Sequence, residues 1–382
     1  MSKNTFFKTT ALVAVLGSTL LGGNAMGALP QNATAVEVPA QTIQLTQEWD
    51  KIFPKSDKVD HRKVTFKNRY GLTLVGDLYV PKNAKGKLPA IAVSGPFGAV
   101  KEQTSGLYAQ TLAERGFVTI AFDGSYTGES SGSPRNVPSP EINTEDFSAA
   151  VDFLGSLDNV NRDEIGILGV CGWGGFALNA AVSDPRIKAV AVSTMYDMTR
   201  VTANGYEIKM QANADGSYDR APAQSADARY KMKLDMSNVR WETSKNGYAD
   251  LLPPNNLDPK KDFTAETPKF VKEYANFYRN ERGYHPRSVN SNPDASWTVT
   301  GMLPLINMPI LKYAAELKSP ALVVHGEIAH SRYFGEDAYK ALGSKDKELY
   351  IVPGATHTDL YDNSTGKIPF DKFEQFFKAK LK

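Results

Sequence analysis

Cys171 is the residue of this sequence best suited to covalent chemistry, and it is the only cysteine of the chain. It lies in the turn Gly-Val-Cys-Gly-Trp-Gly at residues 169–174, between an apolar run that favours a strand and a small-residue run that favours a helix. A nucleophile at such a strand–turn–helix junction forms a nucleophile elbow, which usually carries Ser. The N-terminus of the helix would favour a thiolate. The alternative interpretation is a buried structural cysteine in a glycine-rich turn.

His357 is the candidate general base. It follows the last apolar run, residues 347–353, through the short loop Gly-Ala-Thr-His. An imidazole there could take the thiol proton, hold a thiolate–imidazolium pair with Cys171, and later protonate the leaving group. The chain order of nucleophile, acid and histidine fits a catalytic triad. The alternative is an ordinary loop histidine.

The acid of such a triad has two main candidates. Glu327 follows the apolar run 321–326, and Asp197 follows the apolar run 187–194. Glu327 ranks slightly ahead because the acid should follow the strand that ends there. Asp337 is a third candidate, better suited to a helix surface. A plain ion pair with Arg332 is the alternative for Glu327.

Two backbone N–H groups are predicted to form an oxyanion hole. One belongs to Gly172, the residue after the nucleophile, and the other to the loop after the apolar run 88–94. In that loop Pro96 has no N–H, so Phe97 is the expected donor and Gly98 the second choice. The alternative is that residues 95–98 form only a tight turn.

No metal or cofactor is expected. His325, Glu327 and His330 do not have the spacing of zinc ligands on a helix, and no further cluster of ligands accompanies them. The glycine-rich loop at residues 124–132 lacks the Gly-Lys-Ser/Thr ending of a phosphate-binding loop.

The composition and the N-terminus indicate an exported globular protein. The chain has 382 residues, 41% of them hydrophobic, and a net charge of +2, which gives no footprint for nucleic acid. Residues 1–27 have the charged start, short apolar core and small residues of a signal peptide, with cleavage expected before Ala28. We expect a periplasmic or secreted protein with no membrane span in the mature chain. A lone unpaired cysteine in an exported protein is a candidate reactive thiol.

Apolar runs alternate with helical segments along most of the chain, which predicts a mainly parallel sheet with helices on both faces. Residues 28–60 are expected to form a leader, residues 61–197 and 314–382 the two parts of the core, and residues 198–313, which are polar and aromatic, an inserted helical cap. The expected strands are a hairpin at 63–80 and runs at 88–94, 117–123, 164–170, 187–194, 321–327 and 347–353.

The motifs together resemble the α/β-hydrolases of the dienelactone-hydrolase-like group and related bacterial and fungal hydrolases and polyketide transferases. The resemblance rests on residues 169–175, 123–132, 325–327 and 354–357 and covers about residues 60–198 and 318–382. It implies the α/β-hydrolase fold, a Cys or Ser nucleophile, a histidine on the C-terminal side, and no metal or cofactor. Many relatives carry Asp where this chain has Ala329. Dienelactone hydrolases also hold a Glu near the resting thiol, and the candidate for that part here is Glu102, with a helix-start role as the alternative.

These features predict a hydrolase that cleaves an ester, lactone or thioester through a covalent thioester on Cys171. The aromatic cap predicts a small apolar or aromatic acyl substrate. Two other functions stay open: an acyltransferase that uses the same intermediate, and a non-catalytic binding protein on a hydrolase scaffold.

Overall fold

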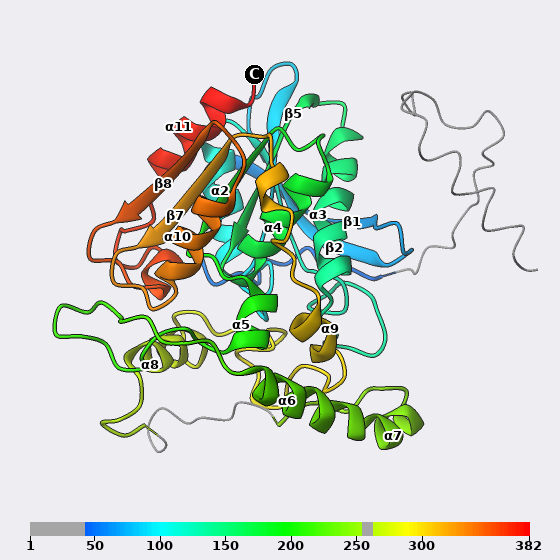
Figure 1. The fold of residues 1–382 in the computed structure, drawn as a ribbon. Coiled ribbons are helices and arrows are strands. Elements are labelled where there is room, and N and C mark those ends of the chain that lie inside the picture. The colour runs from blue at the N-terminus through cyan, green and yellow to red at the C-terminus, as the bar shows by residue number, and fades with distance from the viewer. Residues whose placement is uncertain (1–42, 254–262) are drawn as a thin grey trace, which may run out of the picture. The chain divides into compact units, whose positions relative to one another are not determined.

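The computed structural model describes residues 43–253 and 263–382. The predicted signal peptide and the first part of the predicted leader lie outside these residues. In the described part an eight-stranded sheet has the order β1-β2-β4-β3-β5-β6-β7-β8 (Figure 1). Its strands are β1 (Val59–Lys67), β2 (Thr73–Pro81), β3 (Leu88–Ser94), β4 (Val118–Phe122), β5 (Val160–Val170), β6 (Ala189–Ser193), β7 (Ala321–Gly326) and β8 (Lys347–Val352).

The sheet is mostly parallel, as the sequence predicted. β1 and β2 form an antiparallel hairpin that joins β4, and the remaining strands pair in parallel through to β8. Every residue of β4 and of β6 is buried, because helices cover both faces of the sheet. Continuous apolar runs, rather than alternating ones, are therefore the sequence signal of these strands.

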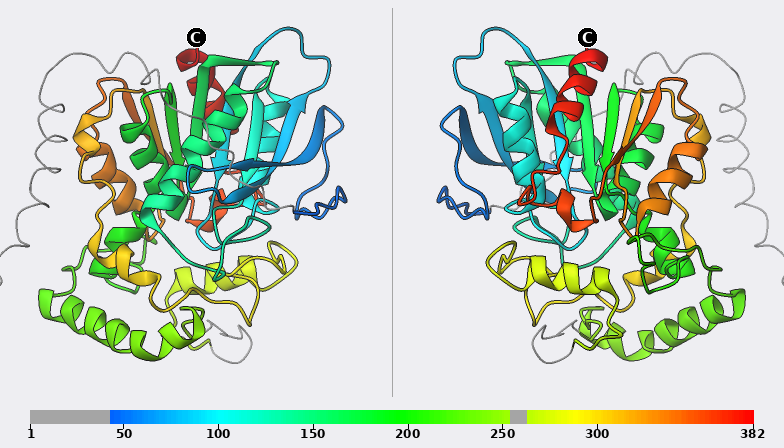
Figure 2. Two further views of the ribbon diagram at one scale, coloured as in Figure 1. Left: turned by 90° about the vertical axis from the view of Figure 1, so that its right-hand side faces the viewer. Right: turned by 90° about the vertical axis from the view of Figure 1, so that its left-hand side faces the viewer.

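Helices pack on the two faces of the sheet (Figure 2). Alternate residues of β3 face opposite cores: Ala90 and Ala92 pack in one hydrophobic cluster, and Ile91 and Val93 pack in the other. The first cluster contains residues of α3 (Pro140–Gly155) and α4 (Gly172–Ser183). The second contains residues of α2 (Thr104–Glu114) and α11 (Phe370–Lys380). α10 (Arg332–Ala341) packs against β7 and β8.

The chain between β6 and β7 consists of short helices joined by irregular stretches and gathers at one end of the sheet (Figures 1 and 2). In its described part only two isolated β-bridges occur, and no strand of the sheet. We call this segment, residues 198–313, the cap. Its helices are α5 (Met198–Asn204), α6 (Ala226–Asn238), α7 (Arg240–Thr243), α8 (Lys269–Tyr278) and α9 (Met302–Asn307), with a 3₁₀ turn at Ser244–Asn246. Within the described residues, no helix has the length and apolarity that a bilayer crossing requires.

Candidate active site

Cys171 occupies the sharp junction between β5 and α4. Its backbone has φ 55° and ψ −127°, a conformation that non-glycine residues rarely adopt and that tends to occur at functional sites. Its N–H donates to the carbonyl of Ser193, and its own carbonyl accepts from Gly174 and Tyr196 at 2.9 and 2.8 Å. The strain is thus held by hydrogen bonds to the neighbouring strand end and to the first turn of the helix.

Close packing explains the glycine before the elbow. A Cβ at Gly169 would overlap the carbonyl of Trp173, so the strand and the helix can approach only with glycine there. The second residue after the nucleophile is Trp173, and its indole packs edge-on against Phe122, Phe147 and Phe176. The elbow is therefore anchored in the core by an aromatic side chain.

The thiol of Cys171 lies beside a hydroxyl and two backbone N–H groups and yet stays neutral at rest. Burial raises the pKa of the thiol to about 11, although contacts with the Tyr361 hydroxyl and with the backbone N–H groups of Gly172 and Phe97 each lower it. The loss of hydration outweighs the donors and the helix N-terminus. The structure thus places both predicted oxyanion-hole residues at the sulfur, but the expected resting thiolate is wrong.

The loop that presents Phe97 is fixed by the cap. The Phe97 ring stacks on Trp297 with centroids 4.2 Å apart, and its carbonyl accepts a hydrogen bond of 2.8 Å from the side chain of Asn290. Both partners come from the last part of the cap. The position of the second N–H donor therefore depends on the cap as well as on the sheet.

His357 is fully buried and is surrounded by hydroxyl groups. Its Nε2 lies 2.9 Å from the Tyr361 hydroxyl, and its Nδ1 lies 2.5 Å from Ser331 Oγ and 2.9 Å from Thr194 Oγ1. Burial, together with two neighbouring histidines, holds the pKa of His357 well below its usual value, so the imidazole is neutral. The predicted thiolate–imidazolium pair is therefore absent at rest, since both partners are uncharged. Thr194 itself has φ 45°, a strained conformation for a β-branched residue.

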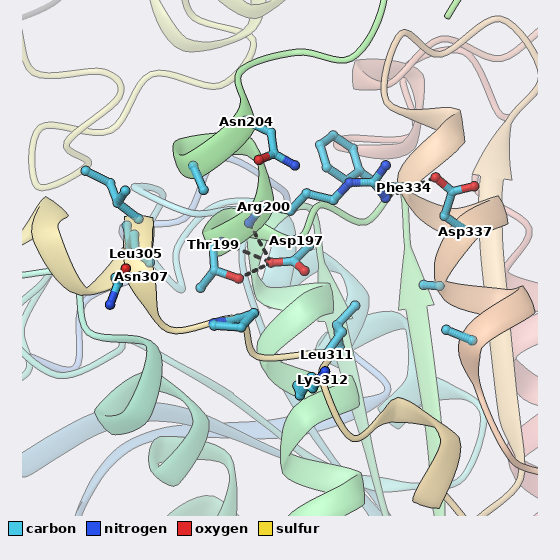
Figure 3. Close-up of a pocket in the computed structure, with 15 residues that line it drawn as sticks. Asp197, Thr199, Arg200, Asn204, Leu305, Asn307, Leu311, Lys312, Phe334 and Asp337 are labelled. Atoms are coloured by element: carbon cyan, nitrogen blue, oxygen red, sulfur yellow. Dashed lines mark hydrogen bonds and ion pairs between the residues drawn. The ribbon is translucent and has the colours of Figure 1, made fainter. Parts of the chain in front are cut away.

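Neither acid that the sequence favoured lies at a hydrogen-bonding position on His357. Glu327 is exposed, and its Oε2 accepts the N–H of Gly354 at 2.8 Å. Asp197 caps the N-terminus of α5, where its Oδ1 accepts from the N–H groups of Thr199 and Arg200 at 3.0 Å (Figure 3). In the described residues, the hydrogen bonds of the His357 ring are made with hydroxyl groups, and Ser331 and Thr194 stand where a triad would place a carboxylate.

The other acidic candidates also have structural partners. Asp337 pairs with Arg200 at 3.0 Å (Figure 3) and with Arg220 at 3.1 Å. Glu102 lies ahead of α2 in a buried ion cluster, with its Oε1 2.5 Å from Lys101 Nζ and 2.8 Å from Arg287. Tyr361, rather than Glu102, is the side chain in contact with the resting thiol.

Cys171 opens into a cavity of about 380 Å³ under the cap. Most of its walls are aromatic or aliphatic, and the cap supplies most of them. The lining residues are Phe97, Cys171, Tyr196, Met198, Val201, Tyr206, Met210, Phe270, Val271, Tyr274, Ala275, Tyr278, Arg279, Val289, Asn290, Ala295, Ser296, Trp297 and Tyr361. Aromatic side chains predicted for the cap thus form the wall of this cavity as well as the core of the cap.

His330 and His325 are structural neighbours of His357. The His330 ring stacks on Phe270 at 4.0 Å with an interplanar angle of 12°, and its Nε2 is hydrogen-bonded to the Tyr196 hydroxyl. Burial lowers the pKa of His325 to about 4. No group of three metal-ligating side chains occurs within residues 43–253 and 263–382. The three histidines therefore form a buried neutral cluster.

Sequence reasoning missed the hydroxyl residues of the site. Ser331, Thr194 and Tyr361 carry no distinctive motif, since each is a common residue in an ordinary loop or turn. The one usable signal is that Tyr361 follows His357 by four residues, a spacing that brings two side chains together on a helical turn.

Comparison with known proteins identifies the family. Residues 71–358 match the family described as X-Pro dipeptidyl-peptidase (S15 family). This chain belongs to the S15 family. An uncharacterized Pseudomonas aeruginosa protein, PA2218, is 54% identical over 341 residues, which cover 89% of this chain and 86% of that protein. Its crystal structure matches with a TM-score of 0.81 and covers 89% of this chain and all of that one.

More distant relatives support the hydrolase character of this S15-family chain. The thiohydrolase aneE of Aspergillus aculeatus is 33% identical over 135 residues, 35% of this chain and 42% of that protein. The α/β-hydrolase GrgF from Penicillium has a TM-score of 0.63 at 20% identity, covering 84% of this chain and 99% of that one. The α/β-hydrolase fold expected from the sequence is thereby confirmed.

Proposed function

We propose that this chain hydrolyses a thioester, ester or lactone of an apolar or aromatic acid through a covalent thioester on Cys171, with His357 as general base. One observation carries the proposal. A strained thiol at a strand–helix junction has two backbone N–H donors at its sulfur and opens into an aromatic cavity. Such a group of a nucleophile, a nearby histidine and oxyanion donors is suited to acyl transfer.

The reaction begins when an acyl group enters the cavity and places its carbonyl carbon beside the sulfur. The thiol proton passes to His357 as the S–C bond forms, and the N–H groups of Phe97 and Gly172 stabilise the negative charge on the carbonyl oxygen. The imidazolium then protonates the leaving alcohol or thiol as its bond to the acyl carbon breaks. A water molecule, deprotonated by His357, releases the acid and restores the thiol.

The cavity supports an uncharged acyl substrate over a peptide N-terminus. A dipeptidyl-peptidase must accept a free terminal ammonium, which requires a carboxylate to replace its hydration when it is buried. Among the described residues that line the cavity there is no Asp or Glu, and the charged one is Arg279. Amines are also poorer leaving groups than alcohols or thiols. Ester or thioester cleavage is therefore proposed, in spite of the peptidase named in the family description.

Acyl transfer is a second candidate, supported by the apolar walls of the cavity. An aromatic cavity holds few water molecules, so an alcohol or amine that binds there could compete for the thioester. The products formed with water alone and with added alcohols separate hydrolysis from transfer. A binding protein without activity would give no products in either case.

The test is mass spectrometry of the purified protein after exposure to aryl esters and thioesters. We expect an acyl adduct on Cys171 that is absent in Cys171→Ala and that forms about 10²–10⁴-fold more slowly in His357→Ala. An X-Pro-nitroanilide serves as the peptide substrate and should be cleaved far more slowly than the esters. Turnover that survives in Cys171→Ala, or a wild type that acquires no adduct from any ester, would overturn the proposal.

We also propose that the protein is exported after removal of residues 1–27. The charged start and short apolar core of that segment support this. N-terminal sequencing of protein recovered from the periplasm or the medium should begin at Ala28, and recovery of the intact chain from the cytoplasm alone would contradict it.

A further inference from the structure

We infer that Tyr361 is a catalytic residue whose hydroxyl carries the proton between the thiol of Cys171 and Nε2 of His357. The inference deepens the proposed function and rests on it. It starts from one arrangement: the Tyr361 hydroxyl lies 2.9 Å from Nε2 of His357 and also contacts the sulfur of Cys171.

The hydroxyl of Tyr361 is held in place from several sides. The side chain is fully buried, and it follows His357 by four residues across the 3₁₀ turn Thr358–Leu360. Its ring packs edge-on against Phe277 at 5.0 Å and against Tyr278 at 6.1 Å, both from α8 of the cap. The carbonyl of the preceding residue accepts a hydrogen bond of 2.8 Å from Tyr108. The hydroxyl is therefore positioned by the core and by the cap together.

The hydroxyl partners of His357 allow a defined direction of transfer. Nδ1 carries the proton and donates to Ser331 or Thr194, which leaves the lone pair of Nε2 directed at Tyr361. The Tyr361 hydroxyl donates to Nε2, and its oxygen accepts from the thiol. With this assignment the Cys171 sulfur, the Tyr361 hydroxyl and both ring nitrogens of His357 each have a hydrogen-bond partner.

The proton balance leaves Tyr361 unchanged. As substrate binds, the S–H proton moves to the phenol oxygen while the phenol proton moves to Nε2. The products of this step are a thiolate, a neutral phenol and an imidazolium. When the leaving group departs, Nε2 returns its proton to the phenol oxygen while the phenol proton passes to the leaving group. Burial among uncharged groups and beside Cys171 raises the pKa of Tyr361 well above its usual value, so a lasting phenolate is disfavoured and the two transfers are coupled.

The experiment measures single-turnover acylation of Cys171 in Tyr361→Phe, which removes only the hydroxyl. We expect acylation to slow about 10²–10⁴-fold, as for the loss of a general base. The double variant with His357→Ala should be no slower than either single variant, because both residues serve one proton transfer. Tyr79→Phe is the matched control: Tyr79 is equally buried, and its hydroxyl has no hydrogen-bond partner among the described residues, so its acylation rate should equal that of the wild type.

A second measurement separates proton transfer from positioning. Replacing Tyr361 with 3-fluorotyrosine keeps the shape and the hydroxyl and changes the acidity of the phenol. A relay requires the acylation rate to change by about twofold or more and its pH profile to move, while a hydroxyl that only packs leaves both unaltered. This variant decides the question even when Tyr361→Phe fails to fold.

The outcomes distinguish the two proposals. An adduct that forms in Tyr361→Phe within about threefold of the wild-type rate, or equal rates with tyrosine and fluorotyrosine, overturns the relay and leaves the thioester mechanism standing. A wild type that acquires no adduct on Cys171 overturns the proposed function itself.

Discussion

The candidate site is electrically neutral at rest and therefore differs from a site with a resting thiolate–imidazolium pair. The pKa of Cys171 is raised to about 11 by burial, and that of His357 is lowered by burial and by its histidine neighbours. Where a carboxylate would stabilise an imidazolium, this chain has Ser331 and Thr194. Under the proposed mechanism, charge separation is therefore driven by the bound acyl group and its contacts. Cysteine suits such a site, because a thiol gives up its proton more readily than a serine hydroxyl.

Cys171→Ser, which changes a single atom, tests whether the site depends on the greater acidity of a thiol. Replacing sulfur with oxygen keeps the shape of the elbow. A serine hydroxyl is less acidic than a thiol, however, so its deprotonation needs a stronger base than His357, which lacks a carboxylate partner. We expect kcat/KM on an aryl ester to fall by roughly 10²-fold or more. The folded state should be retained, which circular dichroism verifies. An undiminished rate in the serine variant would show that the base is stronger than its hydroxyl partners suggest.

Asp197→Asn separates a helix cap from a catalytic acid. Asn caps helices as well as Asp, so we expect the free energy of unfolding to change by less than about 0.5 kcal/mol and kcat/KM to stay near wild type. Asp197→Ala is the companion variant, which should lose about 1–2 kcal/mol of stability with the cap.

Denaturant unfolding and ester turnover on the same preparations provide the comparison. A loss of activity in Asp197→Asn without loss of stability would restore Asp197 as the triad acid. Glu327→Gln applies the same test to the exposed candidate.

The sequence predicted the site residues that belong to a recognisable motif. It missed the residues that reach the site only through the three-dimensional fold. The N–H groups of Gly172 and Phe97 lie at the sulfur of Cys171, because all three residues follow closely on the ends of neighbouring strands. The role of Glu327 could not be judged from sequence, because its direction depends on how the loop folds back on residue 354. The hydroxyl residues that reach His357 come from separate turns, and no local pattern distinguishes them from other hydroxyl residues.

At the scale of elements, the packing around the junction of β5 and α4 positions the two proposed oxyanion donors. A Cβ at Gly172 would lie 2.6 Å from Cβ of Phe97 and 2.7 Å from the side chain of Met198. The first turn of α4, the Phe97 loop and the start of α5 therefore pack without space for a methyl group. A methyl group at residue 172 would therefore push the Phe97 loop or the Met198 side chain away from the elbow.

Gly172→Ala should lower kcat more than it alters KM. The helical backbone accepts alanine, but the methyl group pushes the Phe97 loop away, and loss of one oxyanion donor costs about 10²–10³-fold in kcat. Overpacking should also cost about 1–3 kcal/mol of stability. Steady-state kinetics on an aryl ester measures the effect.

Gly116→Ala is the control variant, which strains the backbone without displacing the Phe97 loop. Gly116 has φ +103°, and a methyl group added there would have no neighbouring atom within 4 Å, so this variant should lose stability and keep its kcat. Equal kcat values for Gly172→Ala and the wild type would contradict the assigned donor geometry.

Elements with strong patterns were predictable, and those shaped by tertiary packing were less so. The buried strands follow continuous apolar runs, so their order along the chain was clear from sequence. α3 begins at Pro140, because Ser139 caps it and Pro140 fits the first turn. The cap helices were not individually predictable. α6, for example, has no buried residue and hence no apolar stripe to find.

At the scale of the molecule, the cap and the sheet together bury a cluster of neutral histidines. The Nε2–H of His325 donates to the carbonyl of Met195 at 3.2 Å, and burial lowers the pKa of His325 to about 4 from about 6.5. Between those two values the unfolded chain binds a proton that the folded chain does not. The contribution of neutral His325 to the free energy of unfolding is therefore fully present above about pH 6.5 and is lost as the pH falls toward 4.

His325→Gln should flatten this dependence. Gln retains a side-chain N–H for the Met195 carbonyl but does not titrate, so between pH 7 and pH 4 the variant should lose about 3 kcal/mol less stability than the wild type. Carboxyls whose pKa is raised, such as Asp146, act in the opposite direction and cancel in the difference. Urea unfolding of both proteins over the pH series gives the measurement. Parallel curves would refute the assignment of His325 as a neutral buried group.

The burial of Cys171 beneath the cap has one more consequence. Peroxides and alkylating agents attack sulfur in its deprotonated form, and a thiol with a pKa of about 11 offers almost none of it at neutral pH. Because it stays protonated, Cys171 is thus protected from oxidation to a sulfenic acid. If the protein is exported and acts as proposed, its one thiol would stay protonated in such surroundings and become reactive when an acyl substrate binds.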